Sequence, residues 1–166
     1  MISKMRKICL TILSVISLSV TQAQFYAGRS YTFLEAQINR ISPQKVEILK
    51  APLEYDNIAD FKGHKIQFVY VPFVVIFVVK VNANGVITEC VNYLTYDTRN
   101  KELTKIVAEE REKAFYKYST LKGKFINDGE YRVFLGDSFM GVLCTDNNKP
   151  YMHYEALKSE VLNKWD

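Results

Sequence analysis

The residues that could carry catalysis or bind a metal are few and lie far apart in the sequence. Neither histidine, His64 or His153, has a second ligand type at the spacing of a metal site. The chain has no G-x-S-x-G, H-E-x-x-H, G-x-G-x-x-G or Walker A motif, each of which marks a common hydrolase, metalloprotease or nucleotide-binding site. The sequence therefore predicts no catalytic, cofactor-binding or metal-binding residues.

Two enzymatic alternatives stay open. Cys144 and His153 could meet in the fold as a nucleophile and its base, because such partners are recognised by geometry and not by sequence distance. Carboxylates far apart in the sequence could likewise pair for hydrolysis. Three neighbouring glutamates, Glu109, Glu110 and Glu112, instead have the spacing of a solvated helix face. An enzyme of unrecognised type, which would be secreted if the export signal described next is functional, is therefore one functional hypothesis.

The first 23 residues have the pattern of a cleavable export signal. Three basic residues, Lys4, Arg6 and Lys7, precede an apolar run over 8–20, and small or polar residues follow it. A signal peptidase is expected to cut after Ala23. The apolar run is too short to cross a bilayer, which needs about 20 residues. We therefore expect a periplasmic or extracellular protein whose mature chain has no transmembrane segment.

Removal of the signal changes the electrostatic character of the chain. The signal carries three basic residues and no acidic ones, so its loss lowers the formal net charge from +4 to +1. A nearly neutral protein gives no electrostatic reason to expect nucleic acid as a partner. The remaining residues, 24–166, have the length of one ordinary domain and contain no linker or sequence repeat.

Two cysteines, Cys90 and Cys144, remain after the signal is removed. An oxidising compartment favours a disulfide between them, and the long loop that it closes would stabilise the fold by about 4 kcal/mol in the chain-entropy model. Two separate buried thiols are the alternative. The sequence has no C-x-x-C pair, so it has no local motif for thiol exchange.

Local patterns over the first part of the mature chain predict one helix and several strands. Apolar residues recur at helical spacing over 32–41, where Thr32 and Glu35 have the spacing of a capping box. A short strand is expected over 45–50. An almost continuous apolar stretch over 66–81 is typical of buried β-structure, and Pro72 within it marks a bend, a bulge or the join of two strands.

The clearest local signal is a hairpin turn at Asn84-Gly85 between two β-prone segments. Both turn residues tolerate the positive φ angle that a tight hairpin requires. A two-residue turn would place Lys80 opposite Glu89, which is a favourable cross-strand pair, whereas a three-residue loop would shift the register by one. The return strand is expected over 86–96.

The C-terminal half predicts a helix, a three-stranded meander and a second helix. Asn100 to Tyr118 has helical spacing, with an apolar stripe on one side. The turn dipeptides Asp128-Gly129 and Gly136-Asp137 separate strands expected over 124–127, 130–135 and 138–144. Pro150 is expected to open a terminal helix with Leu157, Val161 and Trp165 at four-residue spacing.

Together these elements predict a single α+β domain. It would have a mainly antiparallel sheet of about five strands, a central helix packed on one face and a C-terminal helix. All 22 aromatic residues follow the signal. They are expected chiefly in the core, although such side chains also line grooves for sugars or lipids.

The order of elements from Phe68 to Tyr131 resembles the C-terminal domain family of the TonB energy-transducing proteins. The residues that carry the resemblance are Phe77-Val78-Val79-Lys80-Val81-Asn82-Ala83-Asn84-Gly85-Val86-Ile87 and Asn100-Lys101-Glu102-Leu103, followed by a loop with Gly123. The family's P-x-W-x-P element has no counterpart, since only Tyr118 could stand for its tryptophan. The chain also continues past the expected end of the family's domain.

The resemblance implies an envelope module that binds a protein segment by adding a strand at an exposed sheet edge, and it transfers no catalytic residue. The first functional hypothesis is therefore an exported, non-catalytic binding or interaction module. A second is the secreted enzyme, using His64, His153 or dispersed carboxylates. A third is a small carrier of an apolar ligand, which needs a cavity on the order of 300 Å³ or more.

Overall fold

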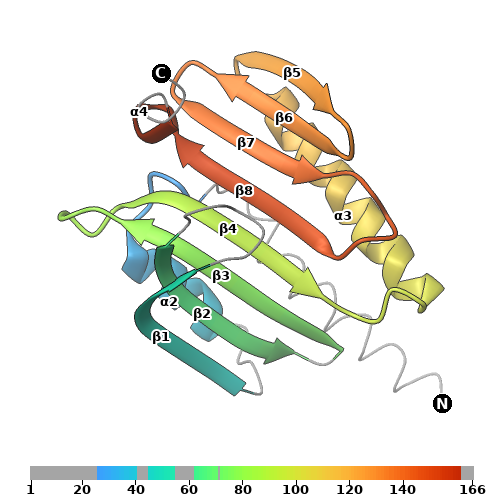
Figure 1. The fold of residues 1–166 in the computed structure, drawn as a ribbon, viewed down its shortest axis with the longest axis horizontal. Helices are drawn as coiled ribbons and strands as arrows, with labels where there is room; N and C mark the ends of the chain where they lie inside the picture. The colour runs from blue at the N-terminus through green and yellow to red at the C-terminus, as the bar shows by residue number, and fades with distance from the viewer. Residues whose placement is uncertain (1–25, 41–44, 55–61, 71, 162–166) are drawn as a thin grey trace.

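The computed structural model describes residues 26–40, 45–54, 62–70 and 72–161, which form one antiparallel sheet and three helices (Figure 1). The predicted signal and Trp165 lie outside these residues. Eight strands run in the order β1-β2-β3-β4-β8-β7-β6-β5 across the sheet. The elements are α2 (Tyr31–Arg40), β1 (Lys45–Glu54), β2 (Lys62–Tyr70), β3 (Phe73–Val81), β4 (Ile87–Thr95), α3 (Lys101–Ser119), β5 (Gly123–Asp128), β6 (Tyr131–Gly136), β7 (Phe139–Cys144), β8 (Tyr151–Leu157) and α4 (Lys158–Val161).

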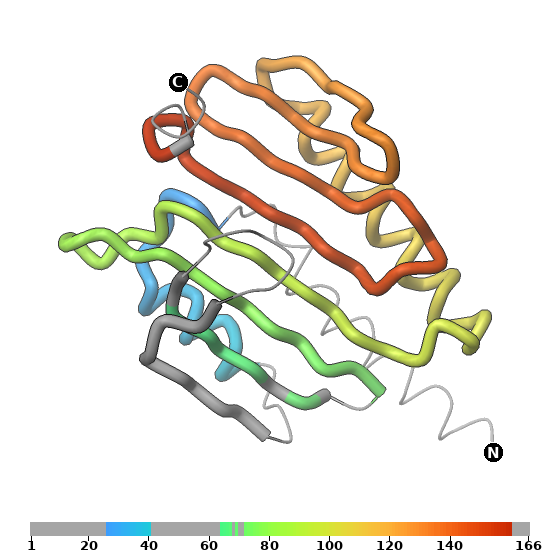
Figure 2. Tube along the Cα trace, viewed as in Figure 1, coloured from blue at the N-terminus to red at the C-terminus, as the bar shows by residue number. Residues whose placement is uncertain are grey.

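The same order of elements occurs twice along the chain, although the sequence itself contains no repeat. A helix followed by a four-stranded meander, α2 to β4, is followed by a second helix and a second four-stranded meander, α3 to β8. The last strands of the two halves, β4 and β8, pair with each other at the centre of the sheet (Figure 2). The C-terminal strand is therefore one of the most interior elements of the sheet.

The predicted sheet of about five strands, with one central helix on a face and a C-terminal helix, is wrong. The sheet has eight strands, two helices share one face, and residues 151–157 form β8 instead of a helix. β8 gains backbone hydrogen bonds from β4 on one side and β7 on the other, and this non-local pairing leaves no periodic signal in a single segment. Lys158–Val161 forms the short helix α4 after it, and the described residues end there.

The hairpin prediction is confirmed, with one refinement. Lys80 lies opposite Glu89, and its Nζ is 3.0 Å from Glu89 Oε1. The loop has three residues, because the Asn82 amide donates to the Val86 carbonyl, and Gly85 has a φ of 73°. A three-residue loop alone would shift the register by one, but a bulge between Lys80 and Val81 compensates for this shift, so Lys80 still lies opposite Glu89.

Most other local predictions agree with the structure. The helices over 31–40 and 101–119 form within one or two residues of their predicted limits. Asn100 caps α3 by accepting hydrogen bonds from two backbone amides, whereas Ser30 and not Thr32 accepts from the first turn of α2. Pro72 stands in the turn between β2 and β3, and the three-stranded meander over 123–144 is present. None of the described helices is long and apolar enough to cross a membrane.

The two faces of the sheet have different surroundings. The helix face is covered by α2 and α3, which lie behind the strands in the view of Figure 1. Leu34 and Ile38 of α2 and Leu103, Val107 and Ala114 of α3 join the side chains of β3, β4, β7 and β8 in the main hydrophobic core. The opposite face, called the open face below because neither α2 nor α3 covers it, carries the alternate residues of the same strands. It is not exposed throughout, since Val78, Val91 and Ala156 are buried there in two smaller hydrophobic clusters.

The polar side of α3 is less exposed than its sequence suggests. Glu110, expected on a solvated helix face, is 4 % exposed and forms an ion pair with Lys113. Arg111 is also buried, and its guanidinium donates to the carbonyl oxygens of Asp146 and Lys149 in the loop that leads into β8. Arg111 therefore fixes the entry of the central strand β8 against α3.

Arg111→Lys is expected to lower the free energy of unfolding by about 2 kcal/mol, since an ammonium cannot reproduce the planar fork that reaches two carbonyls at once. Urea denaturation measures this loss, and hydrogen exchange should show faster exchange in the loop over 146–149. Lys105→Ala, at an exposed position on the same helix, is the control and should change stability little. Equal effects of the two substitutions would contradict the proposed role of Arg111.

Candidate functional site

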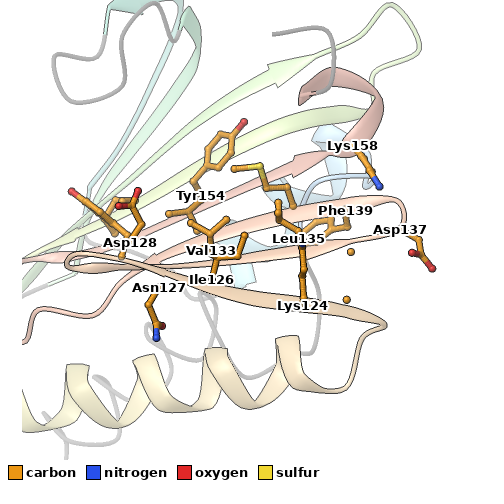
Figure 3. A pocket seen from close by; sticks show the side chains of 16 residues that line it. Lys124, Ile126, Asn127, Asp128, Val133, Leu135, Asp137, Phe139, Tyr154 and Lys158 are labelled. Atoms are coloured by element: carbon orange, nitrogen blue, oxygen red, sulfur yellow. The ribbon is translucent and has the colours of Figure 1, made fainter. Parts of the chain in front are cut away.

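A large apolar hollow lies on the open face of the C-terminal half of the sheet (Figure 3). Its volume is about 1070 Å³. Strands β5 to β8 supply its floor, and the start of α4 supplies one end. We call it the open-face hollow. Its lining residues are Gly123, Lys124, Ile126, Asn127, Asp128, Tyr131, Val133, Leu135, Gly136, Asp137, Phe139, Met140, Val142, Met152, Tyr154 and Lys158.

Strand register arranges this lining in rows that cross the sheet. One row runs through Ile126, Val133, Val142 and Tyr154, each directly opposite the next on its neighbouring strand. A second row, parallel to the first, runs through Lys124, Leu135, Met140 and Ala156. Its side chains are also apolar, except for Lys124. The centre of the hollow is therefore aliphatic, with methionines that adapt to irregular ligand shapes.

Charged residues occupy the two ends of the hollow. Lys124 and Lys158 lie at the end formed by the β6–β7 turn, together with Asp137, whereas Asp128 lies at the β5–β6 hairpin (Figure 3). Within the described residues, neither of these lysine ammonium groups forms an ion pair with a carboxylate. An elongated ligand with one anionic group would thus find cationic side chains at only one end.

A second polar group borders the hollow at the centre of the sheet. The Tyr154 hydroxyl donates to Glu89 Oε2 at 3.0 Å, and Lys80 pairs with the other oxygen of the same carboxylate. Burial and the neighbouring Glu89 carboxylate raise the pKa of Tyr154. Glu89 is 3 % exposed, so this cluster fixes the position of the Tyr154 ring in the wall of the hollow.

The helix face carries a buried polar network that the sequence did not predict. The Tyr118 hydroxyl of α3 shares a hydrogen bond with His153 Nε2, which lies 3.5 Å from Glu155 Oε1. Glu155 Oε2 accepts from the backbone amides of Tyr26 at 2.7 Å and Ala27 at 3.2 Å. The network therefore joins α3, β8 and the segment that precedes α2.

Burial shifts both titratable members of the network toward their neutral forms. Desolvation raises the pKa of Glu155 to about 7, although the two backbone amides and Lys117 oppose the shift. Desolvation, assisted by the Lys117 ammonium, lowers the pKa of His153 to about 3. A histidine with so low a pKa is a poor general base near neutral pH, and His153 is only 6 % exposed. These observations favour a structural role for the network.

The catalytic pairing of Cys144 with His153 is not formed. Residues opposite one another in the register share a face, and Leu143, which lies opposite His153, points into the core on the helix face. Its neighbour Cys144 therefore points to the open face. His64 packs near the Tyr31 ring, with 5.7 Å between the centroids, and is far from His153 in the strand order.

The disulfide between Cys90 and Cys144 is absent as well, and both residues are buried free thiols. Cys90 lies opposite Glu155 on the helix face, whereas Cys144 lies on the open face of a strand two positions away. Two inter-strand spacings separate these strands by about 10 Å, while a disulfide needs Cα atoms within about 7 Å. The sequence lacked this information because it does not show which strands become neighbours.

The described residues contain no group of three His, Cys, Asp or Glu side chains able to hold a metal ion. One sequence signal could have indicated the hollow, namely the alternation of Tyr131, Val133 and Leu135 with polar or core residues. This alternation does not show whether another element covers the open face. No family model, curated protein or solved structure matches this chain, so the resemblance to TonB C-terminal domains stays a prediction and the geometry of the site is the basis for a functional proposal.

Proposed function

We propose that this protein is an exported, non-catalytic binding module that holds an elongated apolar ligand with one anionic group, such as a fatty acid, in the open-face hollow. The observation that carries the proposal is the apolar hollow of about 1070 Å³ on the face opposite the helices. Ligand sites typically measure about 300–1,000 Å³ and combine apolar walls with a few polar groups. The sequence pattern over residues 1–23 supports the exported location.

The shape of the hollow supports an acyl chain over a compact ligand. Its charged ends are separated along β5 by the distance from Lys124 to Asp128, which is about 14 Å at the rise of a β-strand. The aliphatic rows lie between these ends. A chain of medium length would run parallel to the strands over Val133 and Val142, with its carboxylate beside Lys124 and Lys158.

Filling the hollow should abolish binding without unfolding the protein. Val142 lies between Val133 and Tyr154 in the central row and is half-buried, so a Val142→Phe side chain would occupy space that the ligand needs. We expect at least a tenfold weaker affinity for dodecanoate by isothermal titration calorimetry. The matched control is Val74→Phe on the open face of β3, outside the hollow, which should bind like the unchanged protein.

The head group is tested with a matched ligand pair. Lys158→Gln should weaken binding of dodecanoate several-fold and leave binding of dodecanol unchanged, because only the carboxylate uses the lysine charge. Affinity for both ligands that is insensitive to Val142→Phe would place them outside the hollow and overturn the proposal. Failure of the unchanged protein to bind either ligand would do the same.

A further inference from the structure

Exposed apolar side chains gather at one edge of the molecule. Among the described residues, the large hydrophobic side chains that are exposed are Tyr116 (75 %), Leu121 (38 %), Phe125 (40 %) and Ile126 (42 %). Tyr116 lies near the end of α3, Leu121 lies in the connection that follows, and the other two lie in β5. Such grouping beside a sheet edge is typical of a surface that contacts another molecule.

The edge itself is open to strand addition. Among the described residues, β5 is the last strand of the sheet and pairs only with β6, and it is exposed at all six positions. Its pairing with β6 continues from Gly123 to Asp128 without a bulge, and it contains no proline. Natural sheets usually protect such an edge with bulges, prolines or a covering element. Lys124 is the only basic residue of the strand.

We propose that two copies of this chain pair through their β5 edges, antiparallel and related by a two-fold axis at Ile126. The pairing would place Lys124 of each copy opposite Asp128 of the other, and Ile126 opposite Ile126. The result is a closed dimer with one continuous sheet, in which the β5 strands lie at its centre. Phe125, Leu121 and Tyr116 would border the junction on the side of the helices.

The register follows from which face each residue occupies. In an antiparallel pair, directly opposite side chains point to the same face, so a two-fold axis must pass through a residue of β5. An axis at Phe125 would place Lys124 opposite Ile126, and an axis at Asn127 would place Ile126 opposite Asp128. Only the axis at Ile126 matches unlike charges and apolar side chains together.

Neither member of the charged pair has an ion-pair partner on β6, the strand beside it in the same copy. Across β6, Lys124 lies opposite Leu135 and Asp128 lies opposite Tyr131, so neither forms a cross-strand ion pair in the monomer. Ile126 lines the open-face hollow, which means that the hollows of two copies would meet at the dimer axis. The inference rests on the edge and not on the proposed ligand.

Sedimentation velocity of the full chain without ligand tests the proposal. We expect a monomer–dimer equilibrium with a dissociation constant on the order of micromolar, as for a small interface. Lys124→Asp and Asp128→Lys should each weaken self-association at least tenfold, because each places like charges opposite one another twice. An equimolar mixture of the two variants should restore dimers, since every opposing pair is again of unlike charge.

The mixture separates pairing from folding, because a misfolded variant cannot be rescued by a second one that changes a different residue. Circular dichroism of each variant should match that of the unchanged protein. A protein that stays monomeric up to several hundred micromolar (a few hundred times the expected constant) overturns the proposal. Growth beyond dimers, or variants that dimerise alone as well as mixed, also overturns it. Ligand binding is read out separately by calorimetry, so either proposal can fail alone.

Discussion

Gly141→Ala is expected to lower the free energy of unfolding by about 3 kcal/mol, measured by urea denaturation. Gly141 lies in β7 on the helix face, directly under the Tyr118 side chain of α3. A methyl group at this position would overlap the Tyr118 ring carbons and hydroxyl oxygen. The ring has no free direction in which to move, because it is 1 % exposed and stacks on Phe134 with 5.2 Å between the centroids.

The expected loss has two parts that a second substitution can separate. Forcing the Tyr118 ring away from β7 strains the packing of α3, and it also leaves His153 without its hydroxyl partner in a buried site. In a Tyr118→Leu background the same glycine substitution should cost only about 1 kcal/mol, because the opposing ring is gone. Additive effects of the two substitutions would contradict the contact as the cause.

The free energy of unfolding is expected to depend on pH with opposite slopes in two single variants, Glu155→Gln and His153→Gln. The raised pKa of Glu155 stabilises the fold below the unfolded value of 4.5, and this stabilisation is lost as the pH rises toward 7. The lowered pKa of His153 stabilises the fold above 6.5, and this stabilisation is lost as the pH falls toward 3. Between pH 4.5 and 6.5 the two trends oppose each other in the unchanged protein.

Removing one partner should reveal the trend of the other. From pH 4.5 to 6.5, relative to the unchanged protein, the free energy of unfolding should rise by about 2 kcal/mol in Glu155→Gln and fall by about 2 kcal/mol in His153→Gln. Both amides keep hydrogen-bonding groups in the network. Urea denaturation at several pH values measures the two slopes. Slopes of the same sign in both variants would contradict the assignment of opposite shifts.

Both predictions concern one region, where α3 crosses the central strands. Gly141 lies opposite Glu155 in the register, and His153 lies two residues before Glu155 in β8. The glycine makes room for the Tyr118 ring, the ring hydroxyl reaches His153, and Glu155 holds the segment that leads into α2. The helix face therefore joins α3 and the segment before α2 to the central strands, while the hollow lies on the open face of β5 to β8.

Short segments of the sequence were sufficient to predict most of the local elements. Asn84-Gly85 specified a turn because few residues tolerate its backbone angles, and the apolar stripe of α3 specified a helix because its spacing repeats every three or four residues. The same reasoning found the strands around Asp128-Gly129 and Gly136-Asp137. Each of these signals depends on interactions between residues that are close in the chain.

Which of these elements lie side by side was visible only in the folded chain. The placement of β8 between β4 and β7 converted an expected helix into a central strand, put Cys90 and Cys144 on opposite faces, and brought Glu155 beneath α3. It also left the row through Val133 and Val142 lining a hollow on the open face. The physical reason is that strand pairing and burial join residues far apart in the chain, so no short segment of the sequence contains the information that selects them.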